Sequence, residues 1–370
     1  MARGVLFKKV HFPELYVEKD NSVIERLDKF NELQSQVLRK TMIPLKLLNL
    51  STEEIWAFLD GKKLRGRSRS TLIFKNNTTP QIAQLLGFII TDGSLSSTEG
   101  RIKLCQRESE LTREYLDIIN REYDSKFIHN FNGKETHVGS IPLRYILHKY
   151  YGIPLGKKVR TVEVPKQIIN SNNEDVLKSF IAGLFDGDGY VQYYYLENKN
   201  LDHVNFCIST SSHKLVEESI NILDRLGIKC SKLVRKDDKR MTLQTSGFSN
   251  SLIFYQKVIP LIFHRKRRQT AEKVFSSQDF IGKLMVPLNG LLKELFKRII
   301  KNGLNNKLLE LDLKNKYIKS NRSIEAWTYP SNKGNMRSIY VYKACELLKV
   351  NPDLYLPENQ LNLIKKTKWS

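Results

Sequence analysis

The chain carries two copies of one unusual pattern, and this repeat limits the possible folds more than any other feature. The closer copy reads Ile181-Ala182-Gly183-Leu184-Phe185-Asp186-Gly187-Asp188-Gly189, and the looser copy reads Leu85-Leu86-Gly87-Phe88-Ile89-Ile90-Thr91-Asp92-Gly93. Each copy is an apolar run that contains one glycine and ends in Asp-Gly. We therefore predict a duplicated half-domain in which Asp92 and Asp188 occupy equivalent points.

Both copies read as helices that can pair closely. Gly87 and Gly183 hold equivalent places, and a residue without a side chain lets a second backbone approach. If the two helices pair through these glycines, the ends that carry Asp92 and Asp188 come together. The glycine after each aspartate is expected to end its helix in the left-handed conformation.

Two aspartates at paired helix ends are unfavourable unless cations lie beside them. The C-terminus of a helix carries partial negative charge, so an aspartate there costs up to ~1 kcal/mol, and two adjacent carboxylates repel each other. Carboxylates and water are the ligands that Mg²⁺, Mn²⁺ and Ca²⁺ take. We predict a divalent metal site at Asp92 and Asp188, with Mg²⁺ as the metal and Mn²⁺ as a substitute. Ordinary Asp-Gly helix ends in a duplicated core are the alternative, and Asp186 is expected to cap or pair.

The segments after the two copies follow one order. In the first half, strand-like patterns cover 101–106, 126–129 and 136–139, and helical spacing covers 109–123 and 142–150. In the second half, strands are expected at 190–195, 204–209, 228–235 and 241–245, with helices at 215–226 and 252–259. Each half is then helix–strand–strand–helix–strand–strand–helix, which predicts the α+β class with a pseudo-symmetric tandem core.

Four sections are expected along the chain. Residues 1–79 form a mainly helical extension with a basic linker, 80–170 the first half, 171–275 the second half, and 276–370 a mainly helical extension. Ser51 and Glu54 have the spacing of a capping box, which predicts the start of a helix. The basic run after it, 61–69, is either a DNA contact or a solvated linker. The last section is either an accessory DNA-binding region or a cap on the core.

The charge of the chain points to a polyanionic partner. The formal net charge is +22, and such an excess of lysine and arginine attracts nucleic acid first of all. A basic surface without such a partner is the alternative. The sequence has no apolar run of membrane-spanning length and no secretory signal, so we expect a cytoplasmic or organellar protein associated with the nucleoid and not with a membrane.

The two nine-residue copies resemble the paired LAGLIDADG motifs of the homing endonuclease family. Ile181–Gly189 departs from that pattern only at Ile181, Phe185 and Gly187. Leu85–Gly93 keeps the glycine, the apolar positions and the final Asp-Gly, but it has Ile90 in place of the first acid. The resemblance covers about 80–268, and it implies two curved antiparallel sheets that form a saddle in the major groove of DNA.

The resemblance also implies an activity and its residues. The activity is site-specific hydrolysis of both strands of DNA, and Asp92 and Asp188 match the metal-binding acids. A basic residue late in each half contacts the scissile region. Lys158 and Lys266 are the candidates, Lys157 and Arg265 are direct rivals, and phosphate contact without a catalytic part is the alternative reading. The implied partner is double-stranded DNA with a long asymmetric target, bound by a monomer.

Alternation along the expected strands selects residues that face the groove. They are Arg101, Lys103 and Gln106 in the first half and Gln192, Tyr194, Arg235 and Gln244 in the second. Arg and Gln can read guanine and adenine edges, although a register shift of one residue turns each side chain to the other face. In the run 264–268, Arg265, Arg267 and Arg268 are expected to face phosphates.

Three functions stay open on this scaffold. The leading hypothesis is an intron-encoded or free-standing DNA endonuclease. The same fold could serve as an RNA maturase, with intron RNA as a partner, or as a DNA-binding regulator that does not cut. The endonuclease part of an intein is disfavoured, because the sequence starts with Met1 and does not end in His-Asn.

Overall fold

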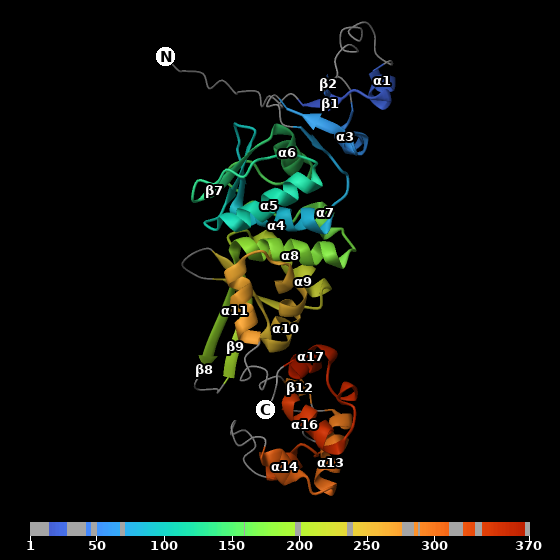
Figure 1. Ribbon diagram of the computed structural model, residues 1–370, viewed down its shortest axis with the longest axis vertical. Helices are drawn as coiled ribbons and strands as arrows, with labels where there is room; N and C mark the ends of the chain where they lie inside the picture. Colours follow the sequence, from blue (N-terminus) through green and yellow to red (C-terminus); the bar gives the residue numbers. More distant parts are fainter. Residues whose placement is uncertain are drawn as a thin grey trace. The chain divides into compact units, whose positions relative to one another are not determined.

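The computed structural model describes residues 15–27, 42–45, 50–66, 71–158, 160–196, 201–234, 240–275, 285–287, 289–310, 321–329 and 335–366. The chain divides into two compact units. One consists of Met1–Gln192 and Asn205–Arg268, and the other of Tyr193–Val204 and Gln269–Ser370. Both nine-residue copies lie in the first unit (Figure 1).

The two copies form the C-terminal parts of two helices, α4 (Pro80–Asp92) and α8 (Glu174–Asp188). Thr79 starts α4, because its hydroxyl accepts a hydrogen bond from the backbone N–H of Ile82 and Pro80 fills the first turn. Asn173 starts α8 in the same way, through the backbone N–H of Asp175. Each helix therefore begins at a polar cap and ends at its aspartate.

Helices α4 and α8 run side by side in the centre of the first unit (Figure 1). A Cβ atom added at Gly87 would lie 2.3 Å from the carbonyl oxygen of Phe180, and one at Gly183 would lie 2.0 Å from that of Gln84. Both neighbours are backbone atoms of the opposite helix, so no side chain fits between them. The predicted pairing of the two copies through their glycines is confirmed.

The glycines after the two aspartates are not left-handed. Gly93 has φ −95° and ψ 165°, and Gly189 has φ −82° and ψ 155°, which are extended conformations. The predicted helix ending was wrong, because the chain passes directly from each helix into a strand. Glycine is required at both positions for steric reasons. A Cβ added at Gly93 would lie 2.6 Å from Cα of Ile89, and one added at Gly189 would lie 2.4 Å from the carbonyl oxygen of Phe185.

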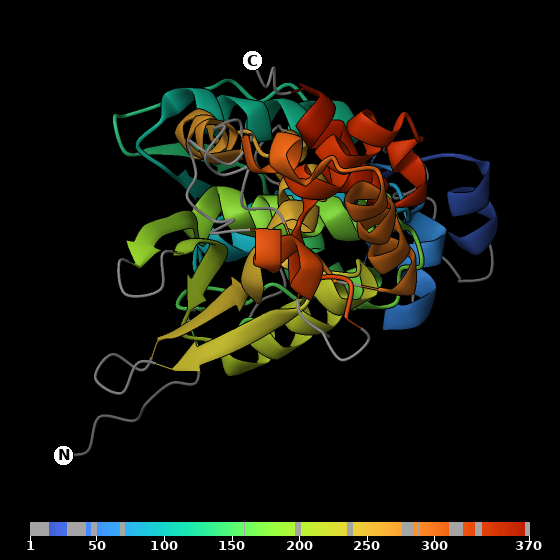
Figure 2. The same cartoon turned by 90° about the horizontal axis from the view of Figure 1, so that it is seen from below.

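The second half shows the complete predicted order. After α8 come β8 (Gly189–Leu196), β9 (Leu201–Thr210), α9 (His213–Arg225), β10 (Cys230–Val234), β11 (Met241–Thr245), α10 (Gly247–Lys257) and the short 3₁₀ helix η4 (Ile259–Leu261). The four strands form one sheet in the order β10-β11-β9-β8. Strands β10 and β11 are an antiparallel pair, drawn in yellow in Figure 2.

The first half lacks one predicted strand. Its elements are α4, β5 (Gly93–Leu95), β6 (Arg101–Cys105), α5 (Ser109–Glu122), β7 (Glu135–Gly139), α6 (Ile141–Tyr145), the π-helical turn η2 (Ile146–Tyr150) and α7 (Lys166–Ile169). The sheet has the order β5-β6-β7. Residues 126–129 form no strand, because the side chain of Asn120 bonds both backbone groups of Phe127, at 2.9 and 2.7 Å. The predicted α+β tandem core is otherwise confirmed.

The N-terminal section is not mainly helical within its described residues. It contains β1 (Tyr16–Glu18), α1 (Asn21–Leu27), β2 (Met42–Pro44), α3 (Thr52–Leu59), β3 (Lys63–Arg65) and β4 (Thr71–Ile73). The strands form a sheet in the order β2-β1-β3-β4, so part of the basic run is a strand and not a linker. Three-residue strands that pair across distant segments carry too little periodicity to be read locally. The Ser51–Glu54 capping box at the start of α3 is confirmed.

The C-terminal section, 276–370, belongs to the second unit and is mainly helical in its described residues, as predicted. Its described elements are β12 (Met285–Pro287), α13 (Gly290–Lys301), α14 (Asn305–Glu310), α15 (Asn321–Ala326), β13 (Asn335–Arg337), α16 (Ser338–Leu348), η5 (Pro352–Leu354) and α17 (Glu358–Lys366). Phe296, Trp327 and Tyr340 form its aromatic centre, with ring centroids 5.2 and 5.7 Å apart. Helix α11 (Arg265–Phe275) joins the two units in sequence. Among the residues described, no helix combines the length and the apolar character needed to cross a bilayer.

Candidate functional site

The pairing of α4 and α8 brings Asp92 and Asp188 together. Each aspartate is the last residue of its helix, and the two helix ends meet at the same end of the pair. A Cβ atom added at Gly187 would lie 3.4 Å from Cγ of Asp92, so the carboxyl group of Asp92 lies against the backbone next to Asp188. The two acids are therefore close enough for the charge of Asp188 to act on Asp92.

Burial makes both carboxylates costly to ionise. Burial and the negative charge of Asp188 raise the pKa of Asp92 to about 6, against the opposing effect of Arg267 and Lys158. Burial also raises the pKa of Asp188, and the positive charges of Arg267, Lys158 and Arg240 oppose that rise. Paired, part-buried acids with raised pKa values are typical of sites that bind a ligand or a metal.

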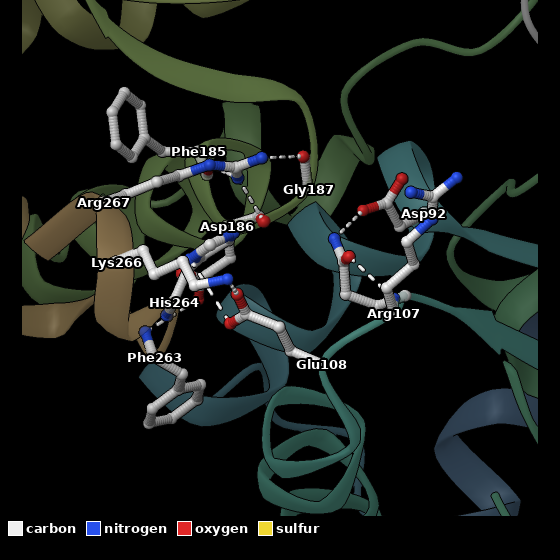
Figure 3. A network of polar contacts seen from close by, with 11 residues as sticks. Asp92, Arg107, Glu108, Phe185, Asp186, Gly187, Phe263, His264, Lys266 and Arg267 are labelled. Carbon is white, nitrogen blue, oxygen red and sulfur yellow. Dashed lines mark hydrogen bonds and ion pairs between the residues drawn. The ribbon is translucent and has the colours of Figure 1, made fainter. Parts of the chain in front are cut away.

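One basic side chain from each half reaches the paired helix ends. The ammonium group of Lys158 donates to the carbonyl of Ile89, and the guanidinium of Arg267 donates to the carbonyl of Phe185 at 2.5 Å. Ile89 and Phe185 are both the fifth residue of their copies, so the two cations occupy equivalent positions. Arg267 also donates to the carbonyls of Asp186 and Gly187 (Figure 3). Both cations complement the negative ends of α4 and α8.

The structure separates the basic candidates that the sequence left open. In the first half Lys158 is buried beside the acids, whereas Lys157 is exposed. Burial lowers the pKa of Lys158 to about 8, against the effect of the two aspartates. In the second half Lys266 is 81% exposed and lies 3.5 Å from Glu108, and Arg265 is also exposed. The residue that reaches the acids is Arg267, although the sequence predicts that it faces phosphates.

Asp186 binds the backbone of Phe263 and His264, the segment that leads into Arg267. Its buried carboxylate accepts a hydrogen bond from the Tyr115 hydroxyl at 2.6 Å. It also accepts hydrogen bonds from the backbone N–H groups of Phe263 at 3.0 Å and His264 at 2.9 Å (Figure 3). Burial raises the pKa of Asp186 to about 6, although these three bonds favour the charged form. The prediction that Asp186 caps or pairs is confirmed. The first copy has Ile90 at this position, which is buried.

Gln106 belongs to the acid pair and not to a groove-reading strand. Its Nε2 donates to Oδ2 of Asp92 at 2.8 Å, and its Oε1 accepts from the backbone N–H of Arg107 at 2.9 Å (Figure 3). Both ends of the amide are thus held, which fixes the orientation of the Asp92 carboxylate. The strand pattern missed this role, because Gln106 lies one residue beyond the end of β6.

The remaining residues predicted to contact DNA are dispersed over the first unit and its boundary. Arg101 and Lys103 lie on β6, Gln192 on β8 and Gln244 on β11. Tyr194 lies in β8, but its side chain is outside the described residues, as is the whole of Arg235. Arg265 is exposed at the start of α11, whereas Arg268 donates to the carbonyls of Pro260 and Ile262.

The donors around Asp92 and Asp188 fit Mg²⁺ better than a metal that needs a closed protein cage. The described residues contain no group of three or more His, Cys, Asp or Glu side chains arranged to hold a metal. Mg²⁺ needs no such group, because it keeps several waters and binds through one or two carboxylates together with the phosphates of a substrate. Two carboxylates are thus within the number of protein ligands that Mg²⁺ takes.

The raised pKa of Asp92 predicts a gain in stability when its charge is removed. Below the pKa of an unfolded aspartate, the Asp92 carboxyl is neutral in both the folded and the unfolded protein. As the pH rises above that value, the unfolded protein loses this proton more readily than the folded one. The free energy of unfolding of the wild type therefore falls until the pH has passed about 6, where Asp92 also ionises in the folded protein. Without metal at pH 8, Asp92→Asn should therefore raise the free energy of unfolding by about 1–3 kcal/mol. Urea unfolding at pH 4 and pH 8 measures this difference, and an equal effect at both pH values contradicts it.

The sequence of the second half matches a known protein family. The model of the LAGLIDADG-like domain matches residues 175–259. The chain is 24% identical over 253 residues to the replication factor C small subunit of Methanocaldococcus jannaschii, covering 66% of this chain and 12% of that protein. It is 25% identical over 169 residues to the glutamine–fructose-6-phosphate aminotransferase of the same organism, covering 45% and 14%. The chain thus matches only about an eighth of the length of these relatives.

Two solved structures with low similarity to this chain are the homing endonuclease I-DmoI and the protein DUF199/WhiA. I-DmoI in complex with DNA and Ca is 18% identical, with a TM-score of 0.37, over 54% of this chain and all of that one. Full-length DUF199/WhiA from Thermatoga maritima is 12% identical, with a TM-score of 0.35, over 80% and 93%. By sequence, residues 175–259 of this chain match the LAGLIDADG-like domain, and the helix that carries their nine-residue copy packs against the helix of the first copy.

Proposed function

We propose that the protein is a site-specific endonuclease that hydrolyses both strands of double-stranded DNA with a divalent metal, Mg²⁺ by preference and Mn²⁺ as a substitute. The observation that carries the proposal is the meeting of Asp92 and Asp188 at the ends of α4 and α8, flanked by Lys158 and Arg267. Two acids and two cations at one point of a chain with net charge +22 suit a phosphodiester substrate.

Each residue of the site would have one task in the reaction. Asp92 and Asp188 would hold the metal, which supplies an activated water and stabilises the leaving oxygen when it is bound. Gln106 would keep the Asp92 carboxylate in place through its 2.8 Å hydrogen bond. Lys158, held by the carbonyl of Ile89, would place a positive charge near the phosphate.

Arg267 would act as a positioning residue. Its guanidinium donates to three successive carbonyls at the end of α8, and this occupies most of its donors. A cation at this place offsets the negative end of the helix and so makes Asp188 easier to ionise.

The two halves support a long asymmetric target bound by one chain. Ile90 in the first copy occupies the position that Asp186 occupies in the second. Likewise, Lys158 in the first half takes the place of Arg267 in the second. The first sheet has three strands and the second has four. Because the halves differ in residues and in strands, the two parts of the bound DNA would differ in sequence. We further propose that 80–170 and 171–275 are the two halves of the DNA-binding core, with 1–79 as an N-terminal extension and 276–370 as an accessory DNA-binding region.

The relatives support a domain that works independently of its host protein. The matched segments occupy 12% of a replication factor and 14% of an aminotransferase, and these names denote different activities. A segment shared by such proteins would carry its own function, such as recognition and cutting of a DNA site.

The direct test is cleavage of a randomised duplex library by the purified protein with Mg²⁺, followed by sequencing of the cut molecules. The proposal expects one enriched site, and no cutting when the metal is chelated. A folded protein that binds duplex DNA but cuts none favours a non-cleaving regulator. One that binds only structured RNA favours a maturase.

Lys158→Met is expected to lower the cleavage rate by about 10²-fold or more, because it removes a buried positive charge beside the acids. Lys266→Met is the matched control, since Lys266 is exposed and pairs only weakly with Glu108. Its cleavage rate should stay within about threefold of the wild type. Single-turnover kinetics at saturating enzyme measure both rates, and equal losses in the two variants contradict the assignment.

A further inference from the structure

The sheet β5-β6-β7 has one face in the core and one face open. Ile102, Leu104, Thr136 and Val138 are buried on the inner side. The outer side carries Arg101, Lys103, Cys105, Glu135 and His137, which we call the first-half face; all five keep part of their surface exposed. This face leads directly to the acids, because Gln106 follows Cys105 and donates to Asp92.

A carboxylate lies at the end of the first-half face that is nearer to Gln106. In the pairing of β6 with β7, Lys103 lies opposite His137, and Cys105 lies opposite Glu135. Oε1 of Glu135 is 3.2 Å from Nζ of Lys103 and 2.8 Å from Nε2 of His137. Its Oε2 accepts from Sγ of Cys105 at 3.5 Å. Three neighbours thus hold one carboxylate.

An acid on a surface proposed to bind DNA needs an explanation, because phosphates repel it. Burial by itself raises the pKa of Glu135, but Lys103, Cys105 and His137 outweigh it and bring the pKa below its usual value. The carboxylate therefore stays ionised, and it remains an acceptor. Lys103 is a donor at 3.2 Å from it, so the face presents a donor and an acceptor side by side.

The major groove offers the complementary pair. A G·C base pair presents the guanine O6 and N7 acceptors beside the cytosine N4 donor. Lysine is a usual partner of the guanine edge, and glutamate is a usual partner of cytosine N4. We propose that Glu135 is a specificity-determining residue that accepts from cytosine N4, while Lys103 donates to the guanine of the same base pair. This inference rests on the proposed binding of DNA.

The second half also has a strand pair with a cysteine, but there an amide lies opposite it. Gln244 on β11 lies opposite Cys207 on β9, as Glu135 lies opposite Cys105. Gln192 on β8 also reaches Cys207, at 3.7 Å from Oε1 to Sγ. Glutamine suits adenine and cannot replace glutamate as an acceptor-only group. Glu135→Gln therefore changes the acceptor-only group into an amide while it keeps the size of the side chain.

The test compares base preferences. The wild type, Glu135→Gln and Lys103→Met each select bound duplexes from a fully randomised library with Ca²⁺ in place of Mg²⁺, and the enriched sequences are read. In the wild type, one position of the site should prefer C over the other bases by about 5- to 150-fold. Glu135→Gln should lose that preference or move it to A, and Lys103→Met should weaken it at the same position.

The controls separate the possible roles of Glu135. Glu114→Gln makes the same chemical change at an exposed acid on α5, outside the first-half face, and its base preferences should equal those of the wild type. Thermal unfolding shows whether each variant is folded. If Glu135→Gln weakens binding equally to all sequences, Glu135 only holds Lys103 and the inference is overturned. If the wild type enriches no sequence at all, the proposed function fails as well, which is a separate result.

Discussion

Asp188→Asn is expected to lower the rate of DNA cleavage by about 10³-fold or more, while the affinity for DNA changes little. The substitution removes one of two carboxylates that would share the metal, and a metal of this kind contributes several kcal/mol to a phosphodiester reaction. The side chain keeps its size, so the packing of α8 against α4 should persist. Single-turnover cleavage and metal-free DNA binding measure the two effects separately.

The matched control is Asp117→Asn, because Asp117 is an exposed aspartate on α5 away from the helix ends. It should cleave at the rate of the wild type. Mg²⁺ adds a second readout, because it should raise the unfolding temperature of the wild type and of Asp117→Asn, and raise that of Asp188→Asn less. Retention of full cleavage by Asp188→Asn would remove the proposed metal site.

Gly183→Ala is expected to lower the free energy of unfolding by about 3 kcal/mol, at the upper end of the usual cost of overpacking. The new Cβ would lie 2.0 Å from the carbonyl oxygen of Gln84 and 2.9 Å from the backbone nitrogen of Phe88. Both belong to the backbone of α4, so relief requires the two helices to move apart. That movement would also separate Asp92 from Asp188 and reduce cleavage.

Gly290→Ala tests whether the loss of stability in Gly183→Ala comes from the steric clash of the new Cβ. Gly290 is exposed at the start of α13, and an added Cβ there meets nothing within 4 Å. Its free energy of unfolding should change by less than ~1 kcal/mol. Urea unfolding compares the two variants, and similar losses at both positions contradict the close contact of α4 and α8.

The sequence predicted the helix pair because its signals are local. A glycine and an Asp-Gly end at the same spacing in two copies specify which faces meet and which ends carry charge. The same reasoning predicted that Asp186 has a structural partner. It failed at residues 126–129, where the side chain of Asn120 takes the backbone bonds that a strand needs. It also failed in the N-terminal sheet, whose strands are only three residues long.

By itself, the sequence determined that this chain holds a paired, two-acid core on a basic scaffold, because spacing and composition are properties of neighbouring residues. Only the tertiary structure decided which side chains join the acids. Successive residues of a helix point about 100° apart, so Arg267 is directed inward while Lys266 next to it is exposed. Gln106 reaches Asp92 because the fold returns β6 beside the end of α4, a contact that no pattern along the chain records.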